Sequence, residues 1–304
     1  MKIIVIGSIN VDYIGTTKYE LMLGESHPGS VSIQAGGVAR NIVENLARVK
    51  ADVTFVTAVG NDFYGQKYKS DLEELGVKII MPKKTEQYNS SIYLAINDKE
   101  GQMVYSVVNT DIVSLINKEY ISTIIDTINT FDYVLIDTNL DSDTIDYLFE
   151  KVNKPIICDA VSTIKADKLR NHLDKIYILK VNENEYSHLE SDLNENIPTN
   201  LIITNGSKPV IYITKPFTKQ YQPKQKEDIK STTGAGDSFV AGVISGILDG
   251  LQIEDGIKRG LDFSYQTLDV TGAVNSNIKK GWKTLFNFAL IVYIHLDMIL
   301  RFAQ

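Results

Sequence analysis

The chain has 304 residues, of which 43% are hydrophobic, and a formal net charge of −7 with a pI near 5.2. This length and composition suffice for a large buried core, whereas the acidic balance argues against a surface built to neutralise a nucleic acid polymer. The single cysteine, Cys158, excludes an intramolecular disulfide and a cysteine-based metal cluster. We therefore expect a soluble cytoplasmic protein whose partners are small molecules.

Short apolar runs typical of buried strands alternate with longer helical patterns. The first run, KIIVIGS at residues 2–8, has the character of a strand rather than of a signal peptide. A helical pattern at 36–50, a strand run at 52–60 and a second helical pattern at 64–76 follow it. The alternation predicts an α/β fold with a central, mostly parallel sheet flanked by helices on both faces. Further strand-like runs lie at residues 132–137, 154–161, 175–182, 200–206 and 209–214.

One segment breaks this alternation. Residues 90–109 contain two β-rich runs joined by a polar turn at Asp98–Gly101, which predicts an antiparallel hairpin without a helix. With residues 11–15 and 29–35, this hairpin is expected to form a small sheet that projects from the core as a lid. A lid that closes over a substrate excludes water. The alternative is an extra edge hairpin without a function.

The segment Thr232–Phe239, TTGAGDSF, precedes a helical pattern rich in small residues. Glycine and alanine at the start of a helix leave backbone N–H groups open to an anion, and the helix dipole adds positive potential. An aspartate there, Asp237, can accept a proton from an attacking hydroxyl group. The alternative interpretation is that Asp237 caps the helix and that the glycines form a tight turn.

A second motif, GGVARN at residues 36–41, opens the helical pattern at 36–50. Paired glycines allow the backbone to approach a polyol closely, and the amide of Asn41 offers both a donor and an acceptor to vicinal hydroxyls. The alternative is that Asn41 faces solvent.

Together these two motifs resemble the signatures of the ribokinase-like, or PfkB, carbohydrate kinases, and the resemblance extends to about residue 277. It implies a single domain that transfers a phosphoryl group from ATP to a sugar hydroxyl, with Asp237 as catalytic base. It also implies that Gly234, Ala235 and Gly236 form the anion hole. The segment 58–66, AVGNDFYGQ, resembles a motif that shapes a turn near the sugar. The implied sugar-binding residues are Asn10, Asp12, Gly36, Gly37, Asn41 and, on the lid, Ser91.

The nucleotide side of the resemblance lies further along the chain. Asn182 and Glu185 match an NxxE motif that implies Mg²⁺ near the phosphates, with Glu185 as the metal residue; hard oxygen ligands suit magnesium. Thr204 and Gly206 match a turn that contacts ATP, and Asn275 matches a late residue that lines the adenine pocket. The chain lacks a GxxxxGK[ST] phosphate loop, so the phosphates must be held another way.

Within this family, residues 25–49, 89–107 and 158–185 resemble the pseudouridine kinases. The implied acceptor is the 5′-hydroxyl of the ribosyl group in pseudouridine. Phosphorylation of ribose, fructose, adenosine or another nucleoside is the alternative within the family, and a non-catalytic nucleoside-binding protein is the alternative outside it. The family also implies a homodimer joined through the projecting sheets.

The chain departs from the family pattern in three places. Ser231 replaces an aspartate of a monovalent-cation site, and its neutral hydroxyl weighs against activation by K⁺. Pro209 replaces a second glycine beside the ATP turn and has no N–H to offer the nucleotide. Residues 278–304 form an unusually apolar end, for which we expect a helix that packs on the core, with a dimer contact or a membrane tether as alternatives. Polar interruptions make a membrane span costly, so no membrane is expected.

Overall fold

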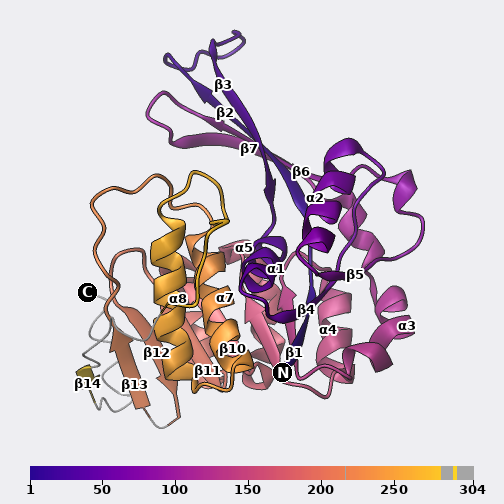
Figure 1. The fold of residues 1–304 in the computed structure, drawn as a ribbon, viewed down its shortest axis with the longest axis vertical. Helices are drawn as coiled ribbons and strands as arrows, with labels where there is room; N and C mark the ends of the chain where they lie inside the picture. The colour runs from indigo at the N-terminus through magenta and orange to yellow at the C-terminus, as the bar shows by residue number, and fades with distance from the viewer. Residues whose placement is uncertain (216, 282–289, 293–304) are drawn as a thin grey trace.

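In the computed structural model, which describes residues 1–215, 217–281 and 290–292, a large helix-covered sheet carries a smaller sheet that projects from one end (Figure 1). The larger sheet has ten strands in the order β14-β13-β12-β11-β10-β9-β8-β1-β4-β5. The strands from β11 to β5 are parallel, and β12, β13 and β14 continue the sheet with antiparallel pairing. Their bounds are β1 Lys2–Ile6, β4 Asp52–Val56, β5 Lys78–Ile80, β8 Tyr133–Asp137, β9 Ile156–Asp159, β10 Ile178–Asn182, β11 Asn200–Thr204, β12 Val210–Thr214, β13 Phe217–Tyr221 and β14 Leu290–Val292.

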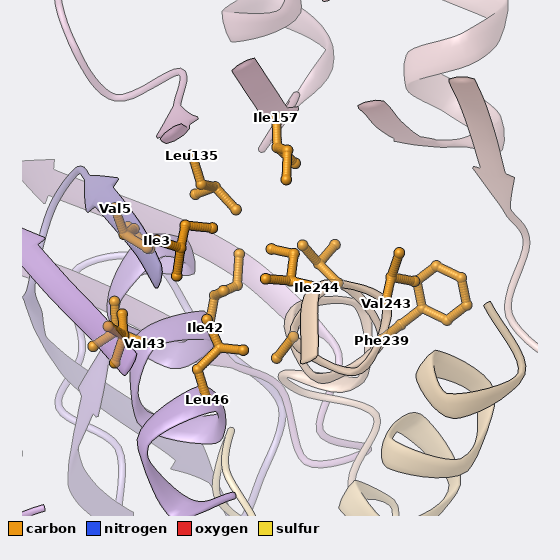
Figure 2. Close-up of a cluster of buried hydrophobic side chains, with 14 of the residues drawn as sticks. Ile3, Val5, Ile42, Val43, Leu46, Leu135, Ile157, Phe239, Val243 and Ile244 are labelled. Atoms are coloured by element: carbon orange, nitrogen blue, oxygen red, sulfur yellow. The ribbon is translucent and has the colours of Figure 1, made fainter. Parts of the chain in front are cut away.

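Alternate strand side chains enter two separate cores, because successive residues of a strand point to opposite faces. Ile3 and Val5 pack under α1 (Val38–Arg48), α2 (Phe63–Glu74), α7 (Ala235–Leu248) and α8 (Ile253–Thr267). Figure 2 shows side chains of α1 and α7 directed at those of β1, β8 and β9. Ile4 and Ile6 enter the core on the other face, which is covered by α3 Lys118–Ile128, α4 Ser142–Lys151, α5 Thr163–Ala166, the 3-10 helix η3 Asp167–Lys175 and α6 Glu183–Glu195.

The expected lid is present as a four-stranded sheet in the order β3-β2-β6-β7. Strand β2 pairs antiparallel with β3 and parallel with β6, which forms the hairpin with β7. Two short 3-10 helices, η1 Thr85–Gln87 and η2 Asp111–Leu115, flank the hairpin. The bounds are β2 Asn10–Thr17, β3 Gly29–Gly36, β6 Ser91–Asn97 and β7 Met103–Asn109.

The carboxyl ends of the parallel strands, the first turns of α1 and α7 and the base of the lid meet at one end of the large sheet (Figure 1). Open parallel sheets bind ligands in the crevice beyond the carboxyl ends of their strands. The fold therefore places the polar motifs where a small-molecule site is expected.

The apolar helix expected over residues 278–304 falls mostly outside the described residues. Where the chain is described, residues 278–281 are not helical and Leu290–Val292 form β14 at the edge of β13, so the expectation is wrong there. Three successive apolar residues, two of them β-branched, suit a strand. No helix within the described part of the chain is long and apolar enough to span a membrane. Cys158 is fully buried, and burial raises the pKa of its thiol.

Candidate active site

Asp237 lies in the first turn of α7, three residues after Gly234, a position that has no room for a side chain. Gly234 caps the helix with φ 75°, a left-handed conformation that favours glycine, and a Cβ on it would lie 2.0 Å from the carbonyl oxygen of Ala273. Ala235 and Gly236 follow as the first helical residues. The predicted anion hole is thus a glycine-capped helix start, in which the N–H of Ala235 already donates to Thr232 O at 3.2 Å and that of Gly236 has no backbone partner among the described residues.

A hydrogen bond joins the two sequence motifs across 196 residues of chain. Asn41 Nδ2 donates to Asp237 Oδ2 over 2.7 Å. The same amide accepts a hydrogen bond through Oδ1 from Arg40 Nη1 at 2.8 Å, which fixes its orientation. Asn41 is 5% exposed, so the alternative that it faces solvent is wrong. The carboxyl of Asp237 and the predicted polyol site therefore adjoin each other.

The environment of Asp237 favours a carboxyl that can exchange a proton near neutral pH. Burial raises its pKa to about 7, and the neighbouring carboxyls of Asp159 and Asp137 act in the same direction. The hydrogen bond from Asn41 and the charge of Lys180 lower the pKa and only partly offset this rise. A base of this pKa is partly ionised at neutral pH.

The predicted sugar-binding residues gather at the base of the lid. In the pairing register, Asn10 of β2 lies opposite Ser91 of β6 and Gly36 of β3. Three buried oxygens there, Asn10 Oδ1, Asp12 Oδ1 and Ser91 Oγ, have no hydrogen-bond partner among the described residues. A buried oxygen without a partner costs about 1–3 kcal/mol. A ligand that brings several hydroxyl donors to this place is thus favoured.

Gly36 lies tightly against the carboxyl of Asp12. A Cβ on Gly36 would lie 2.0 Å from Asp12 Oδ2, so a side chain at this position would displace the carboxyl. Burial raises the pKa of Asp12 to about 6, while the charge of Arg40 opposes the rise. Gly37 caps α1 with φ 98°. The paired glycines therefore give this carboxyl room and turn the chain into α1.

Asp137, which the sequence motifs did not include, ties these parts together from the end of β8. Its Oδ2 accepts hydrogen bonds from the backbone N–H of Ser8 at 3.4 Å and of Ala39 at 3.3 Å. Its Oδ1 accepts one from Asn139 N at 2.9 Å. Asp137 is fully buried, and burial raises its pKa. This residue holds the end of β1 against the start of α1, and so positions the helix that carries Asn41.

Asn182 and Glu185 form a capping box at the start of α6. Asn182 Oδ1 accepts from Glu185 N at 2.9 Å, and Glu185 Oε2 accepts from Asn182 N at 2.7 Å. Glu185 is 1% exposed, whereas the neighbouring Glu183 is exposed. The sequence pattern N-x-x-E is also the pattern of a capping box. The sequence could therefore have predicted this helix start in addition to the nucleotide motif.

This arrangement limits how the pair can serve a metal. No group of three or more His, Cys, Asp or Glu side chains in the described ranges could hold a metal ion. Magnesium often keeps several waters and takes only one or two carboxylates together with substrate phosphates. One carboxylate and one amide oxygen, each already accepting a backbone N–H, fit a hydrated ion held through its waters.

Of the remaining residues predicted to bind the nucleotide, Thr204 and Gly206 lie near Asn182, whereas Asn275 bonds to other parts of the protein. Thr204 ends β11 opposite Asn182 of β10, and Gly206 lies exposed in the turn beyond it. These three residues therefore lie at the carboxyl ends of neighbouring strands. Asn275 is used within the protein, because its Nδ2 donates to Gln266 O at 2.6 Å and its Oδ1 accepts from Asn277 N at 2.9 Å. It is 9% exposed and braces the loop beside Gly234.

The segment 58–66, for which the resemblance implies a turn near the sugar, is bonded to Ser90, the residue before β6. Asp62 caps α2, with Oδ1 accepting from Gly65 N at 2.8 Å, while its Oδ2 accepts from Ser90 N at 2.7 Å. Ser90 Oγ accepts in turn from Gly60 N at 2.9 Å. These bonds anchor the start of β6 and, with it, the neighbouring Ser91.

Two buried charged residues, one at the end of β9 and one in the middle of β10, were not found from the sequence. Lys180 Nζ lies 3.1 Å from Asp159 Oδ2, and both side chains influence the pKa of Asp237. The available signal was a lysine inside the apolar run of β10 and an aspartate that ends the apolar run of β9. Charged residues in such runs are rarely buried unless they are paired.

The site thus combines a carboxyl with a pKa near neutrality, a cluster of buried oxygens without hydrogen-bond partners among the described residues, and a glycine-rich helix start that suits an anion. Ser231, at the position of the expected cation ligand, has a hydroxyl that accepts from Thr233 N at 3.0 Å. Such a set can deprotonate a hydroxyl group and stabilise a phosphoryl group that approaches it.

Comparisons with known proteins agree with this chemistry. The family model described as pfkB family carbohydrate kinase matches residues 1–280. The pseudouridine kinase of Escherichia coli is 27% identical over 271 residues, covering 84% of this chain and 87% of that protein. The ribokinase of Bacillus subtilis is 29% identical over 267 residues, covering 84% and 89%. A solved carbohydrate kinase from Agrobacterium tumefaciens superposes with a TM-score of 0.79 at 26% identity, covering 92% of this chain and 95% of that one.

Proposed function

Because the chain belongs to the pfkB family of carbohydrate kinases, we propose that it phosphorylates the 5′-hydroxyl of the ribosyl group in pseudouridine with ATP. The observation that carries the proposal is the hydrogen bond between Asn41 and Asp237, which joins the start of α1, beside the predicted sugar-binding residues, to the glycine-capped start of α7. The similarity to a pseudouridine kinase over most of both chains supports the choice of acceptor. The products are pseudouridine 5′-phosphate and ADP.

In the proposed reaction Asp237 removes the proton of the acceptor hydroxyl as its oxygen attacks the γ-phosphorus of ATP. The new O–P bond forms while the bond from the γ-phosphorus to the β–γ bridging oxygen breaks, and the electron pair leaves with ADP. The N–H groups at the start of α7 stabilise the charge on the phosphoryl oxygens. Asn41, held by Arg40, orients the carboxyl of the base.

The remaining residues bind and orient the two substrates. Asn10, Asp12 and Ser91 offer unpaired oxygens to the sugar hydroxyls. Thr204 and Gly206 stand where the nucleotide meets the ends of the strands. Mg²⁺, when bound, offsets the charge of the nucleotide phosphates, and Asn182 and Glu185 would hold it through its waters.

A substrate panel tests the acceptor. With Mg²⁺ and ATP, we expect kcat/KM to be highest for pseudouridine among pseudouridine, uridine, ribose, fructose and adenosine. A higher kcat/KM for ribose, fructose or adenosine would refute pseudouridine as the acceptor and leave the proposed kinase activity standing. Absence of turnover with every acceptor would favour the nucleoside-binding alternative.

We also propose that the chain forms a homodimer through the apolar face of the lid. The register aligns Ile33, Tyr13, Leu94 and Val107 in one row across the four strands, on the face opposite Asp12. The next row brings together Val31, Ile96 and Tyr105. Of these, Val107 is 66% exposed and Val31 is 74% exposed. A contiguous exposed apolar face of this kind marks an interaction surface, and its repetition on every copy suits an isologous contact.

Light scattering coupled to gel filtration tests the dimer. We expect twice the mass of one chain for the wild type and the mass of one chain for Leu94→Lys, because the charge would face its own copy across the interface. A wild-type protein that elutes with the mass of one chain would refute this contact.

A further inference from the structure

Lys180 is a buried lysine that the proposed roles do not use. It lies on β10 between Leu179 and Val181, which are both fully buried, and is itself 8% exposed. A lysine is rarely buried to this extent unless it is paired, because removing an ammonium from water is costly. Its position therefore needs a reason beyond packing.

The ammonium group lies against the start of α7. A Cβ built on Gly236 would be 3.4 Å from Lys180 Nζ, so this nitrogen adjoins the residue immediately before Asp237. Its charge acts on the carboxyl of Asp237 and on that of Glu185. Lys180 thus stands between the proposed base, the proposed metal residue and the open N–H groups of the helix.

Asp159 holds this ammonium in place. Its Oδ2 lies 3.1 Å from Lys180 Nζ, and its Oδ1 accepts a hydrogen bond from Val161 N at 2.8 Å. Val161 has φ 62°, a left-handed conformation that is strained for a β-branched residue. The carboxyl of Asp159 is therefore fixed on one side by a tight turn and faces the lysine on the other.

We propose that Lys180 is a catalytic residue whose ammonium contacts the phosphoryl group in transfer, with Asp159 as its positioning residue. This inference rests on the proposed kinase function. Lysine binds phosphate as a point charge, and charge builds on the phosphoryl and leaving oxygens during transfer. Lys180 forms no covalent bond in the step, the hydroxyl proton goes to Asp237, and ADP leaves. The amides of α7 and this ammonium together form the anion hole.

Steady-state kinetics of Lys180→Met test the assignment, because methionine keeps an unbranched side chain and removes the charge. We expect kcat to fall about 100- to 1,000-fold, the usual cost of removing one donor from a site of this kind, with a smaller fall for Lys180→Arg. The matched control is Lys219→Met on β13, whose Nζ also lies 3.1 Å from a carboxylate, that of Glu254, and which should keep wild-type kcat. A Lys180→Met enzyme as fast as the wild type overturns the assignment.

A binding measurement separates phosphate contact from a structural role. Titration calorimetry with Mg²⁺ compares ADP with a non-hydrolysable ATP analogue, without acceptor. We expect Lys180→Met to lose affinity for the analogue and to retain affinity for ADP, whereas equal affinities to wild type for both ligands, or equal losses, overturn the contact.

The assignment stays testable if Lys180→Met does not fold or if the wild type shows no turnover. If Lys180→Met shows no cooperative thermal transition, Asp159→Asn replaces it, and an unchanged preference for the analogue in that variant overturns the positioning role. Because binding needs no turnover, a wild-type protein that phosphorylates no acceptor refutes the proposed function while the comparison of the two nucleotides still decides the role of Lys180.

Discussion

Replacing Asp237 with asparagine should abolish turnover and, at alkaline pH, make the folded protein more stable. The folded structure raises the pKa of this carboxyl from 3.8 to about 7, chiefly through burial and secondly through the charge of Asp159. Above pH 7 the wild type therefore carries a charge that the folded state disfavours. Asparagine has the same shape and no charge, and its oxygen can still accept the hydrogen bond from Asn41 Nδ2.

The magnitude follows from proton linkage. Between pH 3.8 and about 7 the folded state binds more protons at Asp237 than the unfolded state, so the free energy of unfolding falls as the pH rises through this window. A difference of about three pKa units corresponds to about 4 kcal/mol at most, at 1.36 kcal/mol for each unit. For a domain of this size, one kcal/mol shifts Tm by about 2–4 °C. We expect Asp237→Asn to exceed the wild-type Tm by several degrees at pH 8 and by much less at pH 5.

Thermal melting of both proteins without ligands at these two pH values measures the effect. Asp249→Asn is the control of opposite sign, because Arg259 and Lys280 hold hydrogen bonds to Asp249 and, against the effect of burial, lower its pKa. That variant should lose stability at pH 8. A difference in Tm between Asp237→Asn and wild type that is the same at both pH values, or a lower Tm at pH 8, would refute the electrostatic account of this site.

Three other outcomes follow from the same geometry. Below pH 7, log kcat/KM for the preferred acceptor should fall with pH as the carboxyl of Asp237 is protonated in the free enzyme, and a flat rate profile down to pH 5 would remove it as the base. Gly36→Ala should raise KM for the acceptor roughly 10- to 100-fold through displacement of Asp12, with KM for ATP unchanged in the same assay. Asp62→Ala should lower the free energy of unfolding in urea by about 1–2 kcal/mol through loss of a helix cap, and a deficit that does not shrink in acid would contradict its lowered pKa.

The sequence predicted those parts of the molecule whose signal is local. Periodicity located the parallel strands and the hairpin of the lid, because strand and helix periods differ along the chain. Gly36, Gly234 and Asp237 were found because motifs at helix starts have a fixed spacing. The family resemblance, rather than any pattern of residues, predicted that Asn41 and Asp237 belong to one site.

The remaining site residues could not be found in this way. Asp137, Asp159 and Lys180 occupy ends or interiors of apolar strands, where one charged residue alters the periodicity little and its partner lies on another strand. The pairing depends on strand order, which a single sequence does not give. The pattern of Asn182 and Glu185 is easy to find but ambiguous, because the same short pattern is typical of a capping box and of the nucleotide motif.

Comparison of two partly buried carboxyls indicates what distinguishes the proposed base from a structural acid in this fold. Asp62 accepts backbone N–H groups from Gly65 and Ser90, and these bonds lower its pKa although burial opposes them. Asp237 accepts a hydrogen bond from the side chain of Asn41 and has another carboxyl, that of Asp159, nearby, so burial prevails and its pKa rises to about 7. An acid that is fully solvated by amides is a poor acceptor of protons. The carboxyl of Asp237 at the start of α7 thus accepts fewer hydrogen bonds than that of Asp62, and its charged form destabilises the folded state. Asp237→Asn should restore this lost stability at alkaline pH.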